Sequence, residues 1–541
     1  MPGSSAFHQL RRLAADHRAA ERLGMPVAEF RETRRAGALS RRELLRLGAA
    51  AGGGLLLASS APAAAAPLRD SAPRVAVIGA GISGLSTALT LRDAGLPCTV
   101  YEAGDRVGGR MYSERRYWAG GQTSEYGGEL IDSEHKSIRA LCERFGLPLV
   151  DVAAARPAGS RDVLHFGGAY YGQDQLVADF GPVYRAVRAD LRAAGEMPTW
   201  RGATAAGVEL STMSVAEWIE TRVPGGRNSV IGRFIDDAYD VEYGAETVDQ
   251  TAVNLVYLLS GQDDLNDPSV WGQSDERFHI AGGNQRLPEV IAGSLPPGTV
   301  ELGWRLTALA ANPDGTQTLT FSCDGRTRTV RADHTVLTVP LAVLKRLDLG
   351  RAGFDPRMRG AIAAMRMGYC TKLNVQLRSR VYEGRGPWPG VASGRAFSDL
   401  GFQQTWDATW GQPGQQGILI QYGGGNGAWR FQPAGPFLRA EDRTVRQAAE
   451  QVLDNVDLAL PGVRRAWTGR ATLSAWHLDP NTLGAYSCYP IGYCHRYAGY
   501  EGTRQGNVHL AGEHTSFESL GFMNGGVESG QRAAREIIGS V

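Results

Sequence analysis

A glycine-rich turn between a short apolar strand and a helix constrains the fold of this chain more than any other feature. Residues 74–78 form a β-branched apolar run that is typical of a buried parallel strand. A helix-like stretch follows over 85–94, and a second strand is expected over 98–101. The turn carries the glycines of a G-x-G-x-x-G pattern at Gly79, Gly81 and Gly84. Together these elements predict an α/β domain built on a parallel sheet.

Each part of this unit has a role in binding a dinucleotide. The glycines allow a tight turn, a close approach of the backbone to a pyrophosphate, and packing of the helix on the strand. The helix N-terminus stabilises the anion. Glu102 follows the second strand, 18 residues after Gly84, and can accept hydrogen bonds from a ribose hydroxyl. The sequence therefore predicts a dinucleotide-binding domain.

Three further motifs resemble those of the flavin-containing amine oxidase family. Residues 102–110, Glu-Ala-Gly-Asp-Arg-Val-Gly-Gly-Arg, resemble the family's extended nucleotide-binding signature. Residues 125–128, Glu-Tyr-Gly-Gly, resemble its glycine pair near the flavin. The Ala-Gly-Glu at 511–513 and the glycine-rich run at 521–530 resemble its carboxyl-terminal motif. The resemblance covers roughly residues 74–541.

This resemblance implies a two-domain α/β fold with a Rossmann-type FAD-binding domain and a substrate domain that combines a mixed sheet with a helical lobe. The FAD-binding domain is expected to comprise 74–130, 280–340 and 470–541, and the substrate domain 131–279 and 341–469. Helical periodicity in 181–260 agrees with a lobe over the substrate entrance. Asp-Gly pairs at 314–315 and 324–325 predict hairpin turns.

The resemblance also implies FAD as the cofactor and assigns its contacts. These are Gly79, Gly81, Gly84, Glu102, Ala103, Gly109, Arg110, Gly127, Gly128, Glu129, Leu306, Trp476, Gly512, Glu513, Gly521, Phe522 and Met523. FAD is expected to bind non-covalently, because Ala485 stands where covalent members of the family have a cysteine. Cys488 lies three positions further along, beyond the reach of that linkage unless the strand shifts its register.

Four side chains are expected to act at the flavin. Residues 340–345, Pro-Leu-Ala-Val-Leu-Lys, resemble the segment that delivers a lysine to flavin N5, which implies this role for Lys345. Trp476 resembles the tryptophan beside the isoalloxazine. Tyr486 and Phe522 resemble the two facing walls of an aromatic cage, which would exclude water and align the substrate amine.

The reaction implied is oxidation of a C–N bond to an imine, which water hydrolyses, with O₂ reduced to H₂O₂. An amine or polyamine is favoured as the substrate, since residues 128–132, Gly-Glu-Leu-Ile-Asp, lack the carboxylate-binding arginine of L-amino acid oxidases. An L-amino acid, including a basic one, stays open, because Glu129 and Asp132 could bind a distal cation. A flavin-dependent desaturase or dehydrogenase and a non-catalytic flavoprotein also stay open. The desaturase is not expected to combine Lys345 with Tyr486 and Phe522, and bleaching of the flavin by a substrate would distinguish the non-catalytic flavoprotein.

The amino-terminal 66 residues have the features of an export leader. They hold ten Arg and no Lys against five acidic residues, a net charge of +5 within a chain of net charge +1. Arg41 and Arg42 precede a short Ala/Gly/Leu run and an A-x-A pattern at 61–66, an order that resembles a twin-arginine signal. Passage through the twin-arginine translocase to the periplasm or the medium is therefore expected. The segment before Arg41 has no place in such a signal.

Composition excludes several classes of protein. With 541 residues the chain exceeds the size at which single cores usually divide. The net charge of +1 gives no electrostatic case for binding nucleic acid. Six scattered cysteines without a C-x-x-C pair indicate neither a metal site nor a disulfide framework. The oligomeric state, including a homo-oligomer, stays open.

Overall fold

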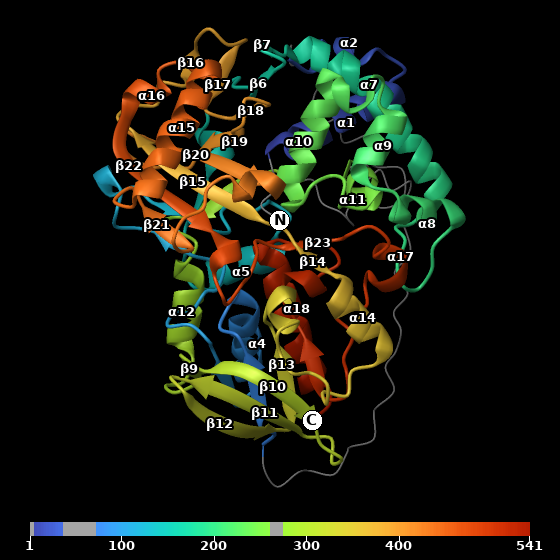
Figure 1. Cartoon of the computed structure of the whole chain (residues 1–541), viewed down its shortest axis with the longest axis vertical. Coiled ribbons are helices and arrows are strands. Elements are labelled where there is room, and N and C mark those ends of the chain that lie inside the picture. Colours follow the sequence, from blue (N-terminus) through green and yellow to red (C-terminus); the bar gives the residue numbers. More distant parts are fainter. Residues whose placement is uncertain (1–4, 36–71, 260–273) are drawn as a thin grey trace.

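One part of the molecule is built around a five-stranded parallel sheet. The computed structural model describes residues 5–35, 72–259 and 274–541, and this sheet lies in the lower part of Figure 1. Its strand order is β24-β13-β1-β2-β9, and every neighbouring pair is parallel. The strands are β1 (Val75–Ile78), β2 (Cys98–Tyr101), β9 (Val300–Glu301), β13 (His334–Leu337) and β24 (Val508–Leu510). The chain thus contributes strands to this sheet from its beginning, its middle and its end.

Two helices that are far apart in the sequence pack closely beside this sheet. They are α4 (Ile82–Asp93), which follows the glycine-rich turn, and α18 (Met523–Ile538) near the C-terminus. A Cβ on Gly530 would lie 2.2 Å from the Ser83 carbonyl oxygen, so only glycine permits this approach. The expected strand, turn and helix at residues 75–93 are confirmed.

A three-stranded antiparallel sheet lies beside the parallel one. It consists of β10 (Arg305–Ala311), β11 (Gln317–Cys323) and β12 (Arg326–Ala332). Its turns contain Gly315 and Gly325, whose φ angles of 82° and 74° suit glycine, so both expected hairpins are confirmed. Shorter helices are α5 (Lys136–Arg144), α6 (Val152–Ala155), α12 (Arg286–Ser294), α13 (Leu341–Leu344), α14 (Pro356–Ala364), α16 (Val463–Ala466) and α17 (Cys494–Tyr497). Two-stranded pairs are β3 (Ser113–Glu114) with β4 (Ser124–Glu125), β5 (Leu149–Asp151) with β8 (Phe278–Ile280), β14 (Arg366–Met367) with β23 (Ser487–Cys488), and β16 (Glu383–Arg385) with β17 (Val391–Ser393).

The second part contains an eight-stranded mixed sheet in the order β21-β22-β15-β20-β19-β18-β6-β7, at the upper left of Figure 1. Its strands are β6 (Val163–Phe166), β7 (Ala169–Tyr170), β15 (Cys370–Leu377), β18 (Ala396–Ser398), β19 (Gln403–Asp407), β20 (Gly417–Gly424), β21 (Phe437–Arg439) and β22 (Trp467–Ala475), and α15 (Arg443–Ala459) packs against it. The central strand β15 is buried along its whole length. The expected domain boundary at residue 470 falls inside β22, which pairs with β15 and belongs to this sheet.

A lobe of helices adjoins this sheet at the upper right of Figure 1. It contains α7 (Gln173–Ala194), α8 (Ala205–Thr212), α9 (Val215–Arg222), α10 (Val230–Tyr243) and α11 (Ala252–Leu259). Helical periodicity predicts helices over 181–260, and the first helix begins eight residues earlier. Helix α10 contacts β19 and β20 of the sheet. No helix in the described ranges is both long and apolar enough to cross a bilayer.

The amino-terminal segment before the twin arginines adds a helical hairpin to this lobe. Helices α1 (Ser5–Arg22) and α2 (Val27–Arg35) pack against each other, and α1 also contacts α7, α10 and α11. Leu10, Leu13 and Phe30 are at most 2% exposed. The Tyr184 hydroxyl donates to Glu21 at 2.8 Å, joining α7 to α1. The segment that the expected export signal does not explain is therefore part of the lobe's core, whereas Arg41, Arg42 and the rest of 36–71 lie outside the described residues.

We expect Leu13→Asp to release the α1–α2 hairpin, because it would bury an unpaired carboxylate in an apolar contact. Residues 5–35 should then become sensitive to limited proteolysis, and the thermal unfolding temperature should fall by several degrees. Leu23→Asp is the matched control, since Leu23 is 36% exposed. Equal protease resistance of the two variants would contradict the docked arrangement.

Candidate active site

A cavity of about 400 Å³ lies between the parallel sheet and the eight-stranded sheet. This volume is in the range of small-molecule sites. The predicted residues that line it are Gly79, Gly81, Glu102, Ala103, Gly109, Arg110, Gly127, Gly128, Glu129, Leu306, Trp476, Tyr486, Gly512, Glu513, Gly521, Phe522 and Met523. Gly84 lies behind the turn instead, where a Cβ would stand 1.9 Å from the Gly79 carbonyl oxygen. Segments from across the chain thus meet around one cavity.

One end of the cavity is formed by the glycine-rich turn and the end of β2. Gly79 has a φ of 105°, and Gly81 precedes α4 with no protein atom within 4 Å of a Cβ built on it. The Glu102 carboxylate accepts hydrogen bonds from the backbone N–H groups of Ala80 and Gly104, both at 2.7 Å. These bonds fix the carboxylate at the cavity wall, and each oxygen keeps a further lone pair for a ligand hydroxyl. The open space at Gly81 and the helix N-terminus behind it fit a pyrophosphate.

A buried ion pair joins the first nucleotide-binding motif to the carboxyl-terminal one. Arg110 Nη1 lies 3.0 Å from Glu513 Oε1 and also donates to the Ala485 carbonyl at 2.7 Å. The other Glu513 oxygen accepts from the Gly521 N–H at 2.8 Å. Burial raises the pKa of Glu513, but neighbouring positive charges, Arg110 first among them, outweigh burial and hold this pKa below its usual value. The pair therefore stays ionised at neutral pH and fixes both motifs at the cavity.

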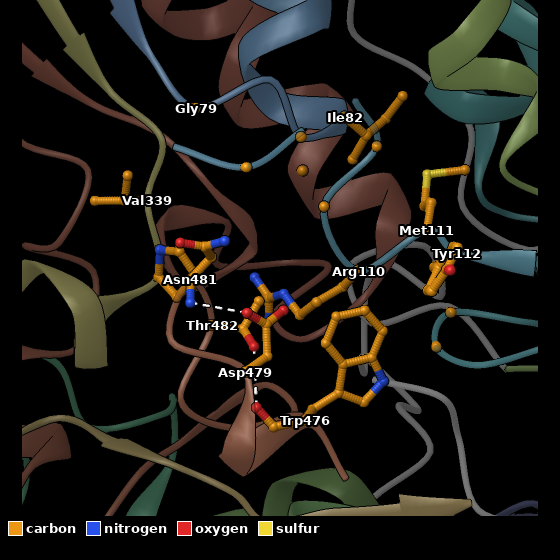
Figure 2. A pocket seen from close by; sticks show the side chains of 18 of the residues that line it. Gly79, Ile82, Arg110, Met111, Tyr112, Val339, Trp476, Asp479, Asn481 and Thr482 are labelled. Atoms are coloured by element: carbon orange, nitrogen blue, oxygen red, sulfur yellow. Dashed lines mark hydrogen bonds between the residues drawn. The ribbon is translucent and has the colours of Figure 1, made fainter. Parts of the chain in front are cut away.

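The segment from Trp476 to Thr482 forms the wall opposite the glycine-rich turn, as Figure 2 shows. Trp476 Nε1 donates to the Tyr126 carbonyl at 2.8 Å, and the Thr482 hydroxyl donates to the Trp476 carbonyl at 3.0 Å. The Asn481 N–H donates to Asp479 at 2.9 Å. Asp479, Asn481 and Thr482 also line the cavity, although no role was predicted for them from the sequence. Their closeness to Trp476 in the sequence was the signal that could have identified them as lining residues.

Aromatic side chains enclose the far end of the cavity, where Tyr486 and Phe522 both line the wall. The Tyr486 hydroxyl donates to the Val241 carbonyl of α10 at 3.0 Å. It also lies 3.3 Å from the Tyr422 hydroxyl and 3.2 Å from Cys370 Sγ, two lining residues that were not predicted from the sequence. Burial raises the pKa of Tyr486 well above its usual value, so the ring stays a neutral phenol. The helical lobe, through α10, thus positions one wall of this aromatic end.

Lys345 does not line the cavity, contrary to the expectation from the sequence. Val343 of α13 and Leu347 both line it, whereas Lys345, the residue that caps α13, does not. Its Nζ donates to the Met365 carbonyl at 2.5 Å. The helical geometry after Pro340, which sequence resemblance does not specify, is the physical reason for this correction.

The lysine at the cavity is Lys372 of β15. Cys370 and Lys372 are two residues apart in the strand, so both face the cavity. Lys372 Nζ donates to Glu129 Oε2 at 2.7 Å and to the Gly127 carbonyl at 3.0 Å. The Lys372 side chain is only 3% exposed. A lysine inside the otherwise uncharged strand sequence 370–377 was the signal that could have found it.

Comparison with known proteins decides the family of this chain. Residues 82–538 match the family model described as flavin containing amine oxidoreductase. The chain belongs to this family. It is therefore an FAD-dependent oxidoreductase, and the fold class expected from the sequence is confirmed.

Relatives in the amine oxidoreductase family differ in the substrates that their names give. Polyamine oxidase 1 of Oryza sativa subsp. japonica is 30% identical over 78% of this chain and 85% of its own length. The L-amino-acid oxidase of Mus musculus is 24% identical over 87% of this chain and 71% of its own length. The solved cyclohexylamine oxidase of Brevibacterium oxydans IH-35A has a TM-score of 0.73 at 22% identity, covering 87% of this chain and 99% of that one, which shows the fold.

We expect acid precipitation to release FAD into the supernatant, because Ala485 stands at the lining position where covalent members of the family have their cysteine. Ala485 lines the cavity, whereas Cys488 is a buried free thiol outside its lining whose pKa is raised by burial to about 12. The measurement is the flavin absorbance of supernatant and pellet. Cys488→Ser should behave like the wild type, and a flavinylated Cys488 peptide would contradict the prediction.

Proposed function

We propose that this enzyme oxidises an amine or polyamine, and that O₂ is the electron acceptor and is reduced to H₂O₂. One observation carries the proposal. Among the described residues that line the aromatic end of the cavity, none offers an unpaired positive charge to the α-carboxylate of an amino acid. Lys372 is paired there with Glu129, and Arg110 is paired with Glu513. Arg106 donates to the Gly109 carbonyl at 2.8 Å.

The remaining lining arginine, Arg305, belongs to β10 beside Leu306. The family resemblance puts Leu306 at the adenine end of the cofactor, away from Tyr486 and Phe522. This arrangement supports an amine over an L-amino acid, which needs a carboxylate clamp next to the reacting carbon.

A buried carboxylate near the aromatic end supports a substrate with a second cationic group. Glu242 of α10 is 1% exposed and directly follows Val241, whose carbonyl accepts the Tyr486 hydroxyl. Its negative charge contributes to the raised pKa values of Cys370 and Tyr486, which places the carboxylate near both. Glu242 does not itself line the cavity, but a buried negative charge behind the wall favours the distal ammonium of a diamine or polyamine electrostatically. The name of the rice relative and a homologous structure described as putrescine oxidase bound to putrescine agree with this class.

When bound, FAD supplies the acceptor for the two electrons of C–N oxidation. The residues that would hold it are those of the glycine-rich turn, Glu102, Arg110, Trp476 and Glu513. Tyr486 and Phe522 would flank the substrate nitrogen and exclude water from it. The neutral Tyr486 phenol suits an uncharged amine, which is the form whose lone pair is available for oxidation.

We expect a panel of amines to be oxidised with release of H₂O₂, with diamines and polyamines preferred over L-amino acids. Glu242→Gln should raise KM for a diamine about tenfold and change KM for a monoamine of similar length less than threefold, since it removes a buried negative charge behind the cavity wall. Glu209→Gln is the control, because that side chain is 65% exposed. The measurement is peroxide formation under air together with anaerobic bleaching of the flavin. Oxidation of L-amino acids alone would contradict the proposal.

We further propose that the enzyme is exported by the twin-arginine route to the periplasm or the medium. The α1–α2 hairpin bears on this point, because removal of the whole leader would remove the part of it that is buried in the lobe. We therefore expect residues 5–35 to stay bound to the folded enzyme when the leader is processed.

Arg41→Lys combined with Arg42→Lys should leave active holoenzyme in the cytoplasm of the native host, because the arginine pair is the address read by the translocase. Activity and immunoblots of cytoplasmic and exported fractions give the measurement. The pair Arg34→Lys and Arg35→Lys serves as a control and should not change export. Unaltered export of the Arg41/Arg42 variant would overturn the proposed route.

A further inference from the structure

A second cavity, at β21, β22 and the start of α15, is lined mainly by arginines; these elements lie at the left of Figure 1. It measures about 520 Å³ and shares no lining residue with the active-site cavity. Its charged lining residues are Arg116, Arg439, Arg446 and Arg470, against a single carboxylate, Glu441, and these residues define an arginine basin. Residues 67–541 are net acidic, because the charge of +5 on the leader exceeds the +1 of the whole chain. The concentration of positive charge at the basin is therefore a local feature.

Two of the four arginines are not neutralised by the chain. Among the described residues, no hydrogen bond or ion pair engages the guanidinium of Arg116 or that of Arg446, and both side chains are exposed. Arg446 stands in the first turn of α15, which contains no acidic residue. A cation there opposes the helix dipole, so the helix N-terminus adds to the positive potential of the basin. The basin thus offers unpaired positive charge.

The other two arginines are held in place around Tyr117, which also lines the basin. The guanidinium carbons of Arg439 and Arg470 lie 5.0 Å and 5.7 Å from the centre of the Tyr117 ring. Arg439 donates to Glu114 Oε2 at 2.7 Å, and Arg470 donates to the Tyr117 carbonyl. Glu114 is itself 4% exposed and accepts from the Tyr126 hydroxyl at 2.9 Å. These contacts fix two arginine side chains before any ligand binds.

An irregular stretch of β22 leaves room beside these side chains. The pairing of β22 with β15 shifts its register at residues 468–470. Gly469 lies in this stretch with a φ of 88°, and no atom lies within 4 Å of a Cβ built on it. The Thr468 hydroxyl donates to the Gln376 carbonyl at 2.9 Å, which holds the stretch against β15. The basin is therefore open at Gly469.

We propose that the arginine basin binds a ligand that carries phosphate groups. Guanidinium groups bind phosphate through paired, charge-assisted hydrogen bonds. A tetrahedral phosphate has acceptors in several directions, which suits arginines that come from separate segments of the chain, whereas a carboxylate has its acceptors in one plane. A further cavity of about 390 Å³ shares Arg116 and Arg439 with the basin, so there is room for two linked phosphates. This site is separate from the cavity of the proposed amine oxidation and does not depend on that function.

The experiment is calorimetric titration of the holoenzyme with inorganic pyrophosphate at neutral pH and constant ionic strength. Bound FAD occupies the pyrophosphate site at the glycine-rich turn, so the titration reports on other sites. We expect one pyrophosphate to bind per chain. Arg116→Gln combined with Arg446→Gln should weaken this binding at least tenfold, because it removes both unpaired cations. Since neither side chain has a partner among the described residues, the variant should fold and unfold thermally like the wild type when no ligand is present.

A matched control separates the basin from the general charge of the protein. Arg351 and Arg535 are exposed arginines outside the basin. Arg351→Gln combined with Arg535→Gln removes the same charge and should bind pyrophosphate within twofold of the wild type. Saturating pyrophosphate should raise the unfolding temperature of the wild type and of this control, but not that of the Arg116/Arg446 variant. Citrate, whose acceptors belong to planar carboxylates, should bind the wild type at least tenfold more weakly than pyrophosphate.

Four outcomes would overturn the inference. The first is a wild-type holoenzyme that does not bind pyrophosphate. The second is equal weakening in the Arg116/Arg446 variant and the control, which would show only general electrostatic attraction. The third is binding of citrate as tight as that of pyrophosphate. The fourth is binding to phosphatidylglycerol vesicles without binding of pyrophosphate, since the basin would then contact a membrane surface instead of a soluble ligand.

Discussion

The ion pair between Arg110 and Glu513 is the interaction on which the rest of the site depends. It joins residues 403 positions apart, and Glu513 is buried, so neither partner can be removed without leaving a charge in a poorly solvated place. Arg110 also holds the Ala485 carbonyl next to Tyr486, and Glu513 holds the N–H of Gly521 next to Phe522. This one ion pair therefore fixes the positions of the nucleotide-binding motif and of both aromatic walls relative to one another.

A second constraint is that charges at the cavity are compensated by charges of the chain itself. Glu129 and Lys372 neutralise each other at the wall where the cofactor and substrate are expected to meet. This leaves a site that does not attract a carboxylate strongly, while Glu242 lies behind the aromatic end. The proposed substrate preference thus follows from this arrangement of buried charge.

The helical lobe connects the amino-terminal hairpin with this site. Helix α1 packs on α10, and α10 supplies both the carbonyl that orients Tyr486 and the carboxylate of Glu242. Apolar residues from α1, including Leu10 and Leu13, belong to the same hydrophobic core as Cys370 and Tyr486. The hairpin therefore supports the element that positions the aromatic end of the cavity, although it precedes the proposed export signal in the sequence.

The sequence by itself determined the α/β nucleotide-binding unit, its glycines, Glu102 and the carboxyl-terminal motif. These features depend on local backbone geometry, and local patterns in the chain specify that geometry directly. Only the tertiary structure decided which lysine faces the cavity. Lys345 fits a motif, but the helical turn after Pro340 directs it away, whereas Lys372 reaches the cavity through the alternation of a strand paired within another sheet. The pairing of Glu129 with Lys372 and the docking of residues 5–35 could not be predicted from the sequence either. Both are contacts between distant segments, and separation along the chain does not determine distance in space.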